Sequence, residues 1–148
     1  MQMNNLIEIL LVEDNPDDVE LTLRALKKCN VANSIQVARD GEEALEIIQC
    51  KGKYALRNTD NRPRVVLLDL KLPKVDGLEV LHTIKSDEKT NTIPVVILTA
   101  SKEEQDIVKS YQLGANSYII KPVDFNKFVQ TITELGLYWL IINKQPGY

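Results

Sequence analysis

Short apolar runs alternate with longer segments of helical periodicity along most of the chain. Five runs consist largely of Val, Ile and Leu, which is typical of strands buried on both faces of a sheet. They cover residues 6–12, 34–38, 65–68, 95–98 and 117–120, and the second is the weakest. After each run, apolar residues recur at helical spacing. Because this strand–helix unit repeats five times, we predict an α/β fold with a parallel sheet covered by helices on both sides.

Cap and turn residues suggest where the predicted helices begin and end. Asn15 and Pro16 suit the cap and the first position of a helix, and acidic residues follow in its first turn. A later helix is expected to cover about residues 102–113. The last helix is expected to run from about residue 124 to 143, with Gly136 as a weak point.

The composition is that of an ordinary globular domain. The 148 residues are 44% hydrophobic and 26% charged, which suits one domain over residues 1–148. A net charge of −3 gives no reason to expect nucleic-acid binding. No apolar run reaches the ~18 residues of a membrane span, and the N-terminus lacks the basic start of a signal peptide. Cys29 and Cys50 form no metal-binding or disulfide pattern, so we expect a cytoplasmic protein with free thiols.

Polar side chains follow four of the predicted strands, at the point where each strand ends. Glu13 and Asp14 follow the first strand, Asp69 the third, Thr99 the fourth and Lys121 the fifth. The carboxyl ends of parallel strands lie at one edge of a sheet, where open α/β proteins bind their ligands. The sequence therefore predicts one cleft that holds three carboxylates, a hydroxyl and an ammonium group.

This set of groups suits phosphoryl transfer to an aspartate. Neighbouring carboxylates repel one another unless a cation joins them, and oxygen ligands of this kind suit Mg²⁺. Lys121 and Thr99 can interact with phosphoryl oxygens, and a carboxylate can act as the nucleophile. A single acid after a strand is more commonly a helix cap or a turn residue. Five such residues at the ends of four strands point instead to a functional site.

Four sequence segments carry a resemblance to a known family. They read ILLVEDNPDD, LLDLKLPKVDGLEVL, IPVVILTAS and SYIIKP, and with their surroundings they cover about residues 6–132. In order and spacing the chain resembles the receiver domain of two-component response regulators. The segments ARDGEEAL, LGANSYIIKPVDF and LGLYWLIINKQP are similar to the cyanobacterial phytochrome response regulators. The resemblance implies a flavodoxin-like (βα)5 fold with strand order 2-1-3-4-5 and an extended C-terminal helix or tail.

The resemblance also implies roles for individual residues in phosphorylation. Asp69 matches the phosphoacceptor, and Mg²⁺, with Mn²⁺ able to substitute, is the implied metal. Asp14 matches its direct ligand, Glu13 a partner that usually acts through water, and the backbone carbonyl of Lys71 the third protein ligand. Lys121 matches the lysine that binds the phosphoryl group.

Four further positions match the switch and the turns of the family. Thr99 matches the switch hydroxyl and Tyr118 the switch aromatic residue. Pro122 matches a proline that usually follows a cis peptide bond, and Gly77 matches the glycine of the turn after the third strand. A lysine at position 71 is not the commonest choice in the family, and its side chain can alter how water reaches the phosphoryl group and so the lifetime of that group.

The implied function is that of a signalling phosphoacceptor rather than an enzyme acting on a separate substrate. A histidine kinase, by the narrower resemblance a phytochrome, would phosphorylate Asp69, and the receiver would assist its own phosphorylation and dephosphorylation. The chain ends soon after the fifth helix, so we expect signalling through protein contacts rather than DNA. The apolar segment 137–142 favours a homodimer formed through the last two helices, the strand between them and the tail. The alternative is that this segment covers the domain's own core.

Two other classes of protein are weaker interpretations. Phosphatases of the haloacid dehalogenase type also place a nucleophilic Asp at the end of a strand. They normally carry a second Asp two residues later as a general acid, and this chain has Lys71 there. A nucleotide-binding module is disfavoured because neither a glycine-rich dinucleotide motif nor a P-loop is present.

Overall fold

The computed structural model describes residues 8–28, 35–54 and 62–136. Their five strands form one sheet in which every neighbouring pair is parallel. The strands are β1 (Ile9–Val12), β2 (Ile35–Ala38), β3 (Val65–Leu68), β4 (Val95–Thr99) and β5 (Ser117–Ile120). Their order across the sheet is β2-β1-β3-β4-β5, which confirms the predicted topology.

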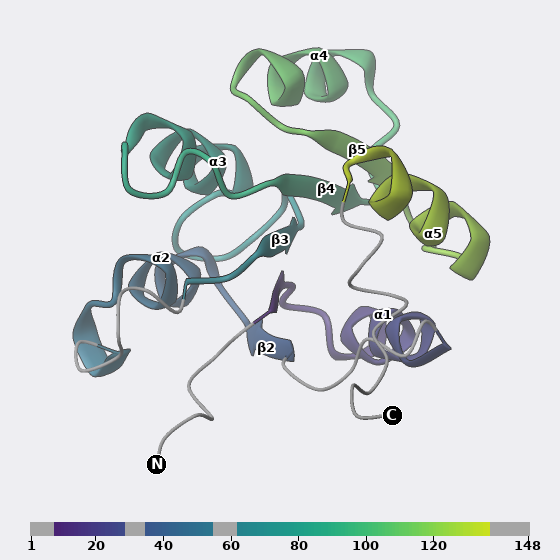
Figure 1. The fold of residues 1–148 in the computed structure, drawn as a ribbon, viewed down its shortest axis with the longest axis horizontal. Helices are drawn as coiled ribbons and strands as arrows, with labels where there is room; N and C mark the ends of the chain where they lie inside the picture. The colour runs from purple at the N-terminus through teal and green to yellow at the C-terminus, as the bar shows by residue number, and fades with distance from the viewer. Residues whose placement is uncertain (1–7, 29–34, 55–61, 137–148) are drawn as a thin grey trace.

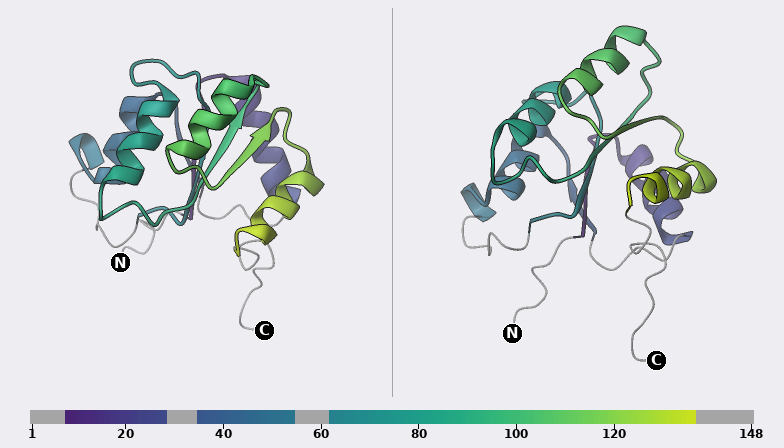
Figure 2. Two further views of the ribbon diagram at one scale, coloured as in Figure 1. Left: turned by 90° about the horizontal axis from the view of Figure 1, so that it is seen from above. Right: turned by 45° about the horizontal axis from the view of Figure 1, so that its top comes forward.

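The helices form two outer layers around this sheet. They are α1 (Pro16–Lys28), α2 (Gly41–Gln49), α3 (Gly77–Ser86), α4 (Glu104–Gln112) and α5 (Phe125–Glu134), together with a short 3₁₀ helix, η2 (Gly52–Tyr54). Figures 1 and 2 show α2 and α3 on one face of the sheet and α1 and α5 on the other. No helix among the described residues is long and apolar enough to cross a lipid bilayer.

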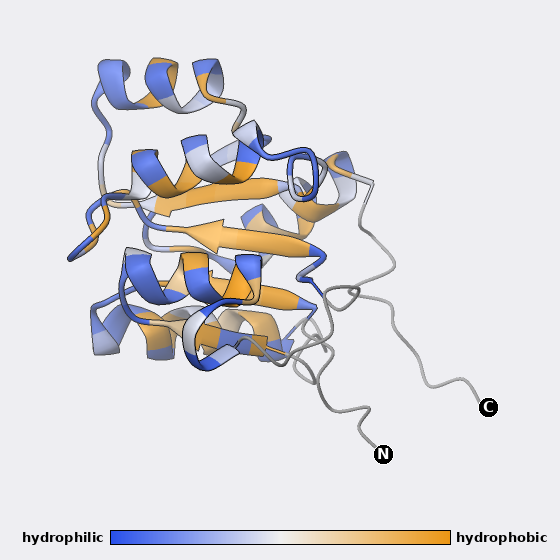
Figure 3. Ribbon diagram, turned by 90° about the vertical axis from the view of Figure 1, so that its left-hand side faces the viewer, coloured by the Kyte–Doolittle hydropathy of each residue, from blue (hydrophilic) through white to orange (hydrophobic). Residues whose placement is uncertain are grey.

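Two hydrophobic cores result from the alternation of side chains along each strand. Leu10 and Val12 of β1 face the core beneath α2 and α3, whereas Ile9 and Leu11 face the core beneath α1 and α5. All four side chains are at most 1% exposed. Figure 3 shows this apolar sheet enclosed between amphipathic helices. The strands that carry the site residues are therefore held rigidly in the middle of the molecule.

Side-chain caps begin most of the helices where the sequence predicted a start. Asn15 Oδ1 accepts hydrogen bonds from the backbone N–H groups of Asp17 and Asp18, at 2.9 and 3.0 Å. Asp40, Asp76 and Asp124 cap α2, α3 and α5 in the same way. These caps use N–H groups that have no acceptor within the helix. They fix where each helix leaves the edge of the sheet.

The prediction that the last helix continues to about residue 143 is wrong. Helix α5 ends at Glu134, where the backbone N–H of Leu135 donates to the carbonyl of Thr131 and that of Gly136 donates to the carbonyl of Thr133. Gly136 follows with a φ of 76°, a left-handed conformation that glycine adopts at low cost and that ends a helix. The apolar segment 137–142, to which the tail prediction refers, lies outside the described residues.

Candidate functional site

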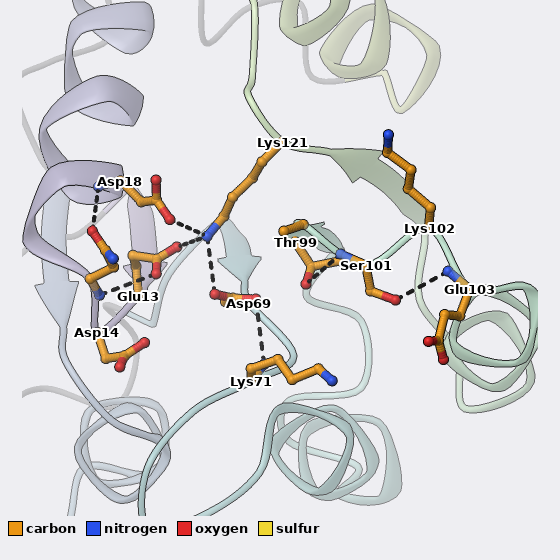
Figure 4. A pocket seen from close by; sticks show the side chains of 12 residues that line it. Glu13, Asp14, Asp18, Asp69, Lys71, Thr99, Ser101, Lys102, Glu103 and Lys121 are labelled. Atoms are coloured by element: carbon orange, nitrogen blue, oxygen red, sulfur yellow. Dashed lines mark hydrogen bonds and ion pairs between the residues drawn. The ribbon is translucent and has the colours of Figure 1, made fainter.

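All the polar residues predicted at the strand ends line one cleft at the carboxyl edge of the sheet. The cleft has a volume of about 650 Å³ and is shown in Figure 4. It is lined by Glu13, Asp14, Asn15, Asp18, Asp69, Lys71, Thr99, Ala100, Ser101, Lys102, Glu103 and Lys121. It lies where β1 and β3 meet, between helices that leave on opposite faces of the sheet, which is the expected position for a ligand in this fold.

Asp69 lies directly after β3 and is only 6% exposed. Its backbone N–H donates to the carbonyl of Val12 at 3.1 Å, which continues the pairing of β3 with β1. Its Oδ1 accepts a long hydrogen bond of 3.4 Å from the N–H of Lys71, and its Oδ2 accepts one of 3.1 Å from Lys121 Nζ. The backbone position of this carboxylate is therefore fixed while its oxygens face the cleft.

Gly77 lets the chain fold closely over Asp69. A Cβ at this position would lie 2.2 Å from the carbonyl oxygen of Asp69 and 2.5 Å from Cα of Leu70. The N–H of Gly77 donates to the carbonyl of Leu70 at 2.9 Å. The glycine is required for this close approach, in agreement with its predicted place in the turn after the third strand.

Lys121 lies at the centre of the acidic cluster. Its Nζ is 2.6 Å from Glu13 Oε1, 2.8 Å from Asp18 Oδ2 and 3.1 Å from Asp69 Oδ2, and its side chain is 12% exposed. Burial by itself would lower the pKa of Lys121, but hydrogen bonds to Asp18 and Glu13 and the charge of Asp69 outweigh it and raise the pKa. Lys121 therefore carries a positive charge at any physiological pH. The peptide bond to Pro122 is cis, as the resemblance implied.

Burial raises the pKa of Glu13, which belongs to the same cluster. Its side chain is 2% exposed, and loss of hydration together with the charge of Asp69 raises its pKa to about 7, although the hydrogen bond from Lys121 lowers it. Three carboxylates around one ammonium leave excess negative charge in the cleft. The cluster can relieve that charge by taking up a proton or a cation.

The acidic residues fit a divalent cation. One carboxylate oxygen from each of Glu13, Asp14 and Asp69 can be chosen so that all three lie within 4.8 Å of one another. Asp14 is exposed and the other two are buried, so the group opens to solvent on one side. Carboxylate oxygens are the ligands that Mg²⁺ and Mn²⁺ prefer. Lys71 lines the same cleft two residues after Asp69.

Thr99 and Tyr118 are linked through the backbone of Ser101. Thr99 Oγ1 accepts a weak hydrogen bond of 3.4 Å from the N–H of Ser101, and the Tyr118 hydroxyl donates to the Ser101 carbonyl at 3.1 Å. Ser101 Oγ donates to Asp106 Oδ2 in α4 at 2.6 Å. The loop between β4 and α4 thus connects the cleft to the surface formed by α4 and β5.

Asp18 is the site residue that the sequence analysis missed. We interpreted it only as an acid in the first turn of α1, where negative charge favours the helix dipole. In the structure its carboxylate reaches Lys121, which is 103 residues away along the chain. Asp14 precedes the cap residue Asn15 and lies outside α1, so no helical spacing in the sequence linked Asp18 to the site.

Known response regulators are similar to this chain in sequence over most of its length. The model of the response regulator receiver domain matches residues 9–133. The chain is 43% identical over 141 residues to the probable methanogenesis regulatory protein FilR2 of Methanothrix harundinacea, covering 94% of this chain and 87% of that protein. It is 38% identical over 132 residues to response regulator Rcp1 of Synechocystis sp., covering 89% and 88% respectively.

Solved structures of phytochrome response regulators are similar over nearly their whole length. The bacteriophytochrome response regulator AtBRR is 57% identical, with a TM-score of 0.82 over 94% of this chain and 99% of that one. The phosphorylated cyanobacterial regulator RcpA is 40% identical, with a TM-score of 0.76 over 96% and 99%. The Mn²⁺-bound form of Rcp1 is 36% identical, with a TM-score of 0.75 over 95% and 99%. The chain therefore belongs to the response regulator receiver domain family of two-component signalling, and phytochrome response regulators are among its relatives.

Proposed function

We propose that this receiver accepts a phosphoryl group from a histidine kinase on Asp69, in a Mg²⁺-dependent reaction, and signals through protein–protein contacts. One observation carries the proposal. The carboxylate of Asp69 contacts Lys121 at 3.1 Å and belongs to the group of three acids whose oxygens approach within 4.8 Å. A nucleophile, a fixed cation and a candidate metal site thus occur together at the carboxyl edge of one rigid sheet.

The chemistry follows from the charges around Asp69. Its carboxylate oxygen attacks the phosphorus of a phosphohistidine in line with the leaving imidazole, so a P–O bond forms as the P–N bond breaks. Lys121 and the hydroxyl of Thr99 would contact phosphoryl oxygens. Glu13, Asp14, Asp69 and the backbone carbonyl of Lys71 would hold Mg²⁺ or Mn²⁺, with Glu13 acting through water. When bound, the metal supplies positive charge to the phosphoryl oxygens.

The signal leaves the cleft through the β4–α4 loop. Movement of Thr99 toward a phosphoryl oxygen would break its weak contact with the N–H of Ser101, whose carbonyl holds the Tyr118 hydroxyl. Tyr118 would then change its position between the sheet and the surface. The expected result is a shift in the equilibrium of the α4–β5–α5 face between two arrangements.

A phytochrome is the proposed kinase, and the cytoplasm is the proposed compartment. The support for the kinase is that several of the most similar solved structures are response regulators of phytochromes or bacteriophytochromes. Phosphotransfer profiling against the histidine kinases of the source organism tests this assignment. Transfer from an unrelated kinase, with none from a phytochrome, would contradict it.

A homodimer formed through α4, β5, α5 and the C-terminal tail is the proposed output assembly. On α4, Val108 is 46% exposed and Tyr111 is 48% exposed, so this face presents apolar side chains to solvent. Light scattering at tens of micromolar protein, with and without phosphorylation, tests the dimer. A monomer under both conditions would contradict it.

The phosphoacceptor assignment is tested by intact-mass spectrometry after incubation with Mg²⁺ and acetyl phosphate. The wild type is expected to gain the mass of one phosphoryl group, and Asp69→Asn is expected to gain none. A wild type that remains unmodified, or equal labelling of both proteins, would refute the proposal. Failure to turn over simple phosphate esters would separate the receiver from a phosphatase.

A further inference from the structure

Each of the three N–H donors of Lys121 can be assigned to a carboxylate. The partners are Glu13 at 2.6 Å, Asp18 at 2.8 Å and Asp69 at 3.1 Å. An ammonium group has three donors, so this arrangement uses all of them. A phosphoryl oxygen can therefore receive a hydrogen bond from Lys121 only if one of these acids gives up its place.

Asp18 is the acid that can leave at the least cost. Its side chain is 35% exposed, compared with 2% for Glu13 and 8% for Asp69. Glu13 is also held by a hydrogen bond from the N–H of Asn15 to its Oε2, at 3.2 Å, and Asp69 is the residue that carries the phosphoryl group. Water can solvate the released carboxylate of Asp18, whereas it cannot reach a released Glu13 as readily. Figure 4 shows Asp18 approaching Lys121 from α1, on the side away from Thr99.

We propose that Asp18 is a positioning residue that holds Lys121 in the unphosphorylated protein and releases it when a phosphoryl group arrives on Asp69. This inference rests on the proposed function and adds a residue to it. Lys121 exchanges one charge-assisted hydrogen bond for another and remains protonated, and the Asp18 carboxylate turns to solvent without changing its charge. Asp18 therefore competes with the phosphoryl group for the same donor.

The competition predicts that replacing Asp18 increases the affinity of the protein for a phosphoryl mimic. Removing the charge at position 18 leaves Lys121 with one fewer strong acceptor, so one of its three N–H donors becomes available to an incoming anion. Because Asp18 is partly exposed, the gain is modest. We expect roughly threefold to fivefold tighter binding of a phosphoryl mimic, which corresponds to the upper part of the range for a solvent-screened ion pair.

The experiment measures the affinity of the protein for beryllofluoride in the presence of Mg²⁺. Asp18→Asn and Asp18→Ser are compared with Asp17→Asn, a matched control. Asp17 lies next to Asp18 in the first turn of α1, is exposed, and carries the same charge. The Asp18 variants are expected to bind roughly threefold to fivefold more tightly than wild type, and Asp17→Asn within about twofold of it.

A double-mutant cycle with Lys121→Met separates competition at Lys121 from a general change of charge or fold. With methionine at position 121, Asp18→Asn is expected to leave beryllofluoride affinity unchanged. Equal effects of the Asp17 and Asp18 substitutions, weaker binding by the Asp18 variants, or an undiminished effect with Met at 121 would each overturn the role of Asp18. A wild type that neither binds beryllofluoride nor takes up a phosphoryl group would overturn the proposed function itself.

Discussion

The main-chain carbonyl of Asp69 lies over Gly77 so closely that a Cβ there would approach its oxygen to 2.2 Å. Position 77 begins α3, where alanine would otherwise be favoured over glycine by up to about 1 kcal/mol. The contact reverses that preference, because the atoms that must move are backbone atoms beside the phosphoacceptor. The conformation of the loop after β3 therefore depends on the absence of a side chain at this position.

Gly77→Ala is predicted to lower the free energy of unfolding by about 1–3 kcal/mol and to slow the labelling of Asp69 by acetyl phosphate. Urea denaturation and intact-mass time courses measure the two effects. Gly136→Ala is the control: a Cβ there meets nothing within 4 Å, and only the strained φ of 76° costs stability. If Gly77→Ala labels at the wild-type rate, the close approach does not position Asp69.

The raised pKa of Glu13 predicts that stabilisation by Mg²⁺ depends on pH. In the metal-free protein its pKa is raised to about 7, from 4.5 for an unperturbed glutamate. The folded state therefore binds the proton more tightly, and the contribution of Glu13 to stability, present below pH 4.5, is lost as the pH rises through about 7. A metal ion requires the ionised form, so it competes with this proton.

The rise in melting temperature on adding Mg²⁺ is accordingly expected to be larger at about pH 8 than at about pH 6. Thermal unfolding with and without Mg²⁺ at the two values measures the difference. In Glu13→Gln, most of this pH dependence should disappear. An equal Mg²⁺ effect at both pH values in the wild type would contradict the assignment of Glu13.

Ser101 is predicted to stabilise the start of α4. Its Oγ donates to Asp106 at 2.6 Å and accepts from the N–H of Glu103 at 3.2 Å, whereas the cap residue Glu103 makes no side-chain cap of its own. Ser101→Ala should cost about 1 kcal/mol and speed amide hydrogen exchange in the first turn of α4. Ser86→Ala, which removes only a hydroxyl bond within α3, should leave exchange in α4 unchanged. Equal exchange in both variants would exclude this role.

The core beneath α5 is predicted to account for a large part of the stability. Ile132 is fully buried among residues of β1, β3, β4 and α1. Ile132→Ala should lower the free energy of unfolding by about 2–5 kcal/mol because it removes apolar contacts and leaves a cavity. Val108→Ala, on the exposed face of α4, should change it by less than about 0.5 kcal/mol. Chemical denaturation compares the two, and similar losses would contradict the assigned packing.

The sequence pattern was sufficient to predict the sheet and most of the site. Apolar runs of four or five residues can be read directly as central strands, and parallel strands bring their carboxyl ends to one edge whatever lies between them. Glu13, Asp14, Asp69, Thr99 and Lys121 therefore lie together as predicted. The strand order followed from family resemblance and is confirmed by the structure.

Interactions that depend on side-chain direction could not be predicted in this way. An acid in the first turn of a helix is sufficiently explained by the helix dipole, so nothing local indicated that Asp18 reaches Lys121. The contacts of Ser101 with Tyr118 and Asp106 depend on the conformation of a loop. The end of α5 was misplaced because apolar periodicity continues beyond Gly136, while the backbone conformation of that glycine ends the helix.

The central claim is that Asp69 receives the phosphoryl group. The most direct measurement is to treat the phosphorylated protein with borohydride, which reduces an acyl phosphate to the alcohol, and to locate the altered residue by peptide mass spectrometry. The account predicts that the peptide containing Asp69 is converted only when Mg²⁺ and acetyl phosphate are both present. Conversion of Glu13, Asp14 or Asp18 instead of Asp69, or no conversion at all, would contradict it.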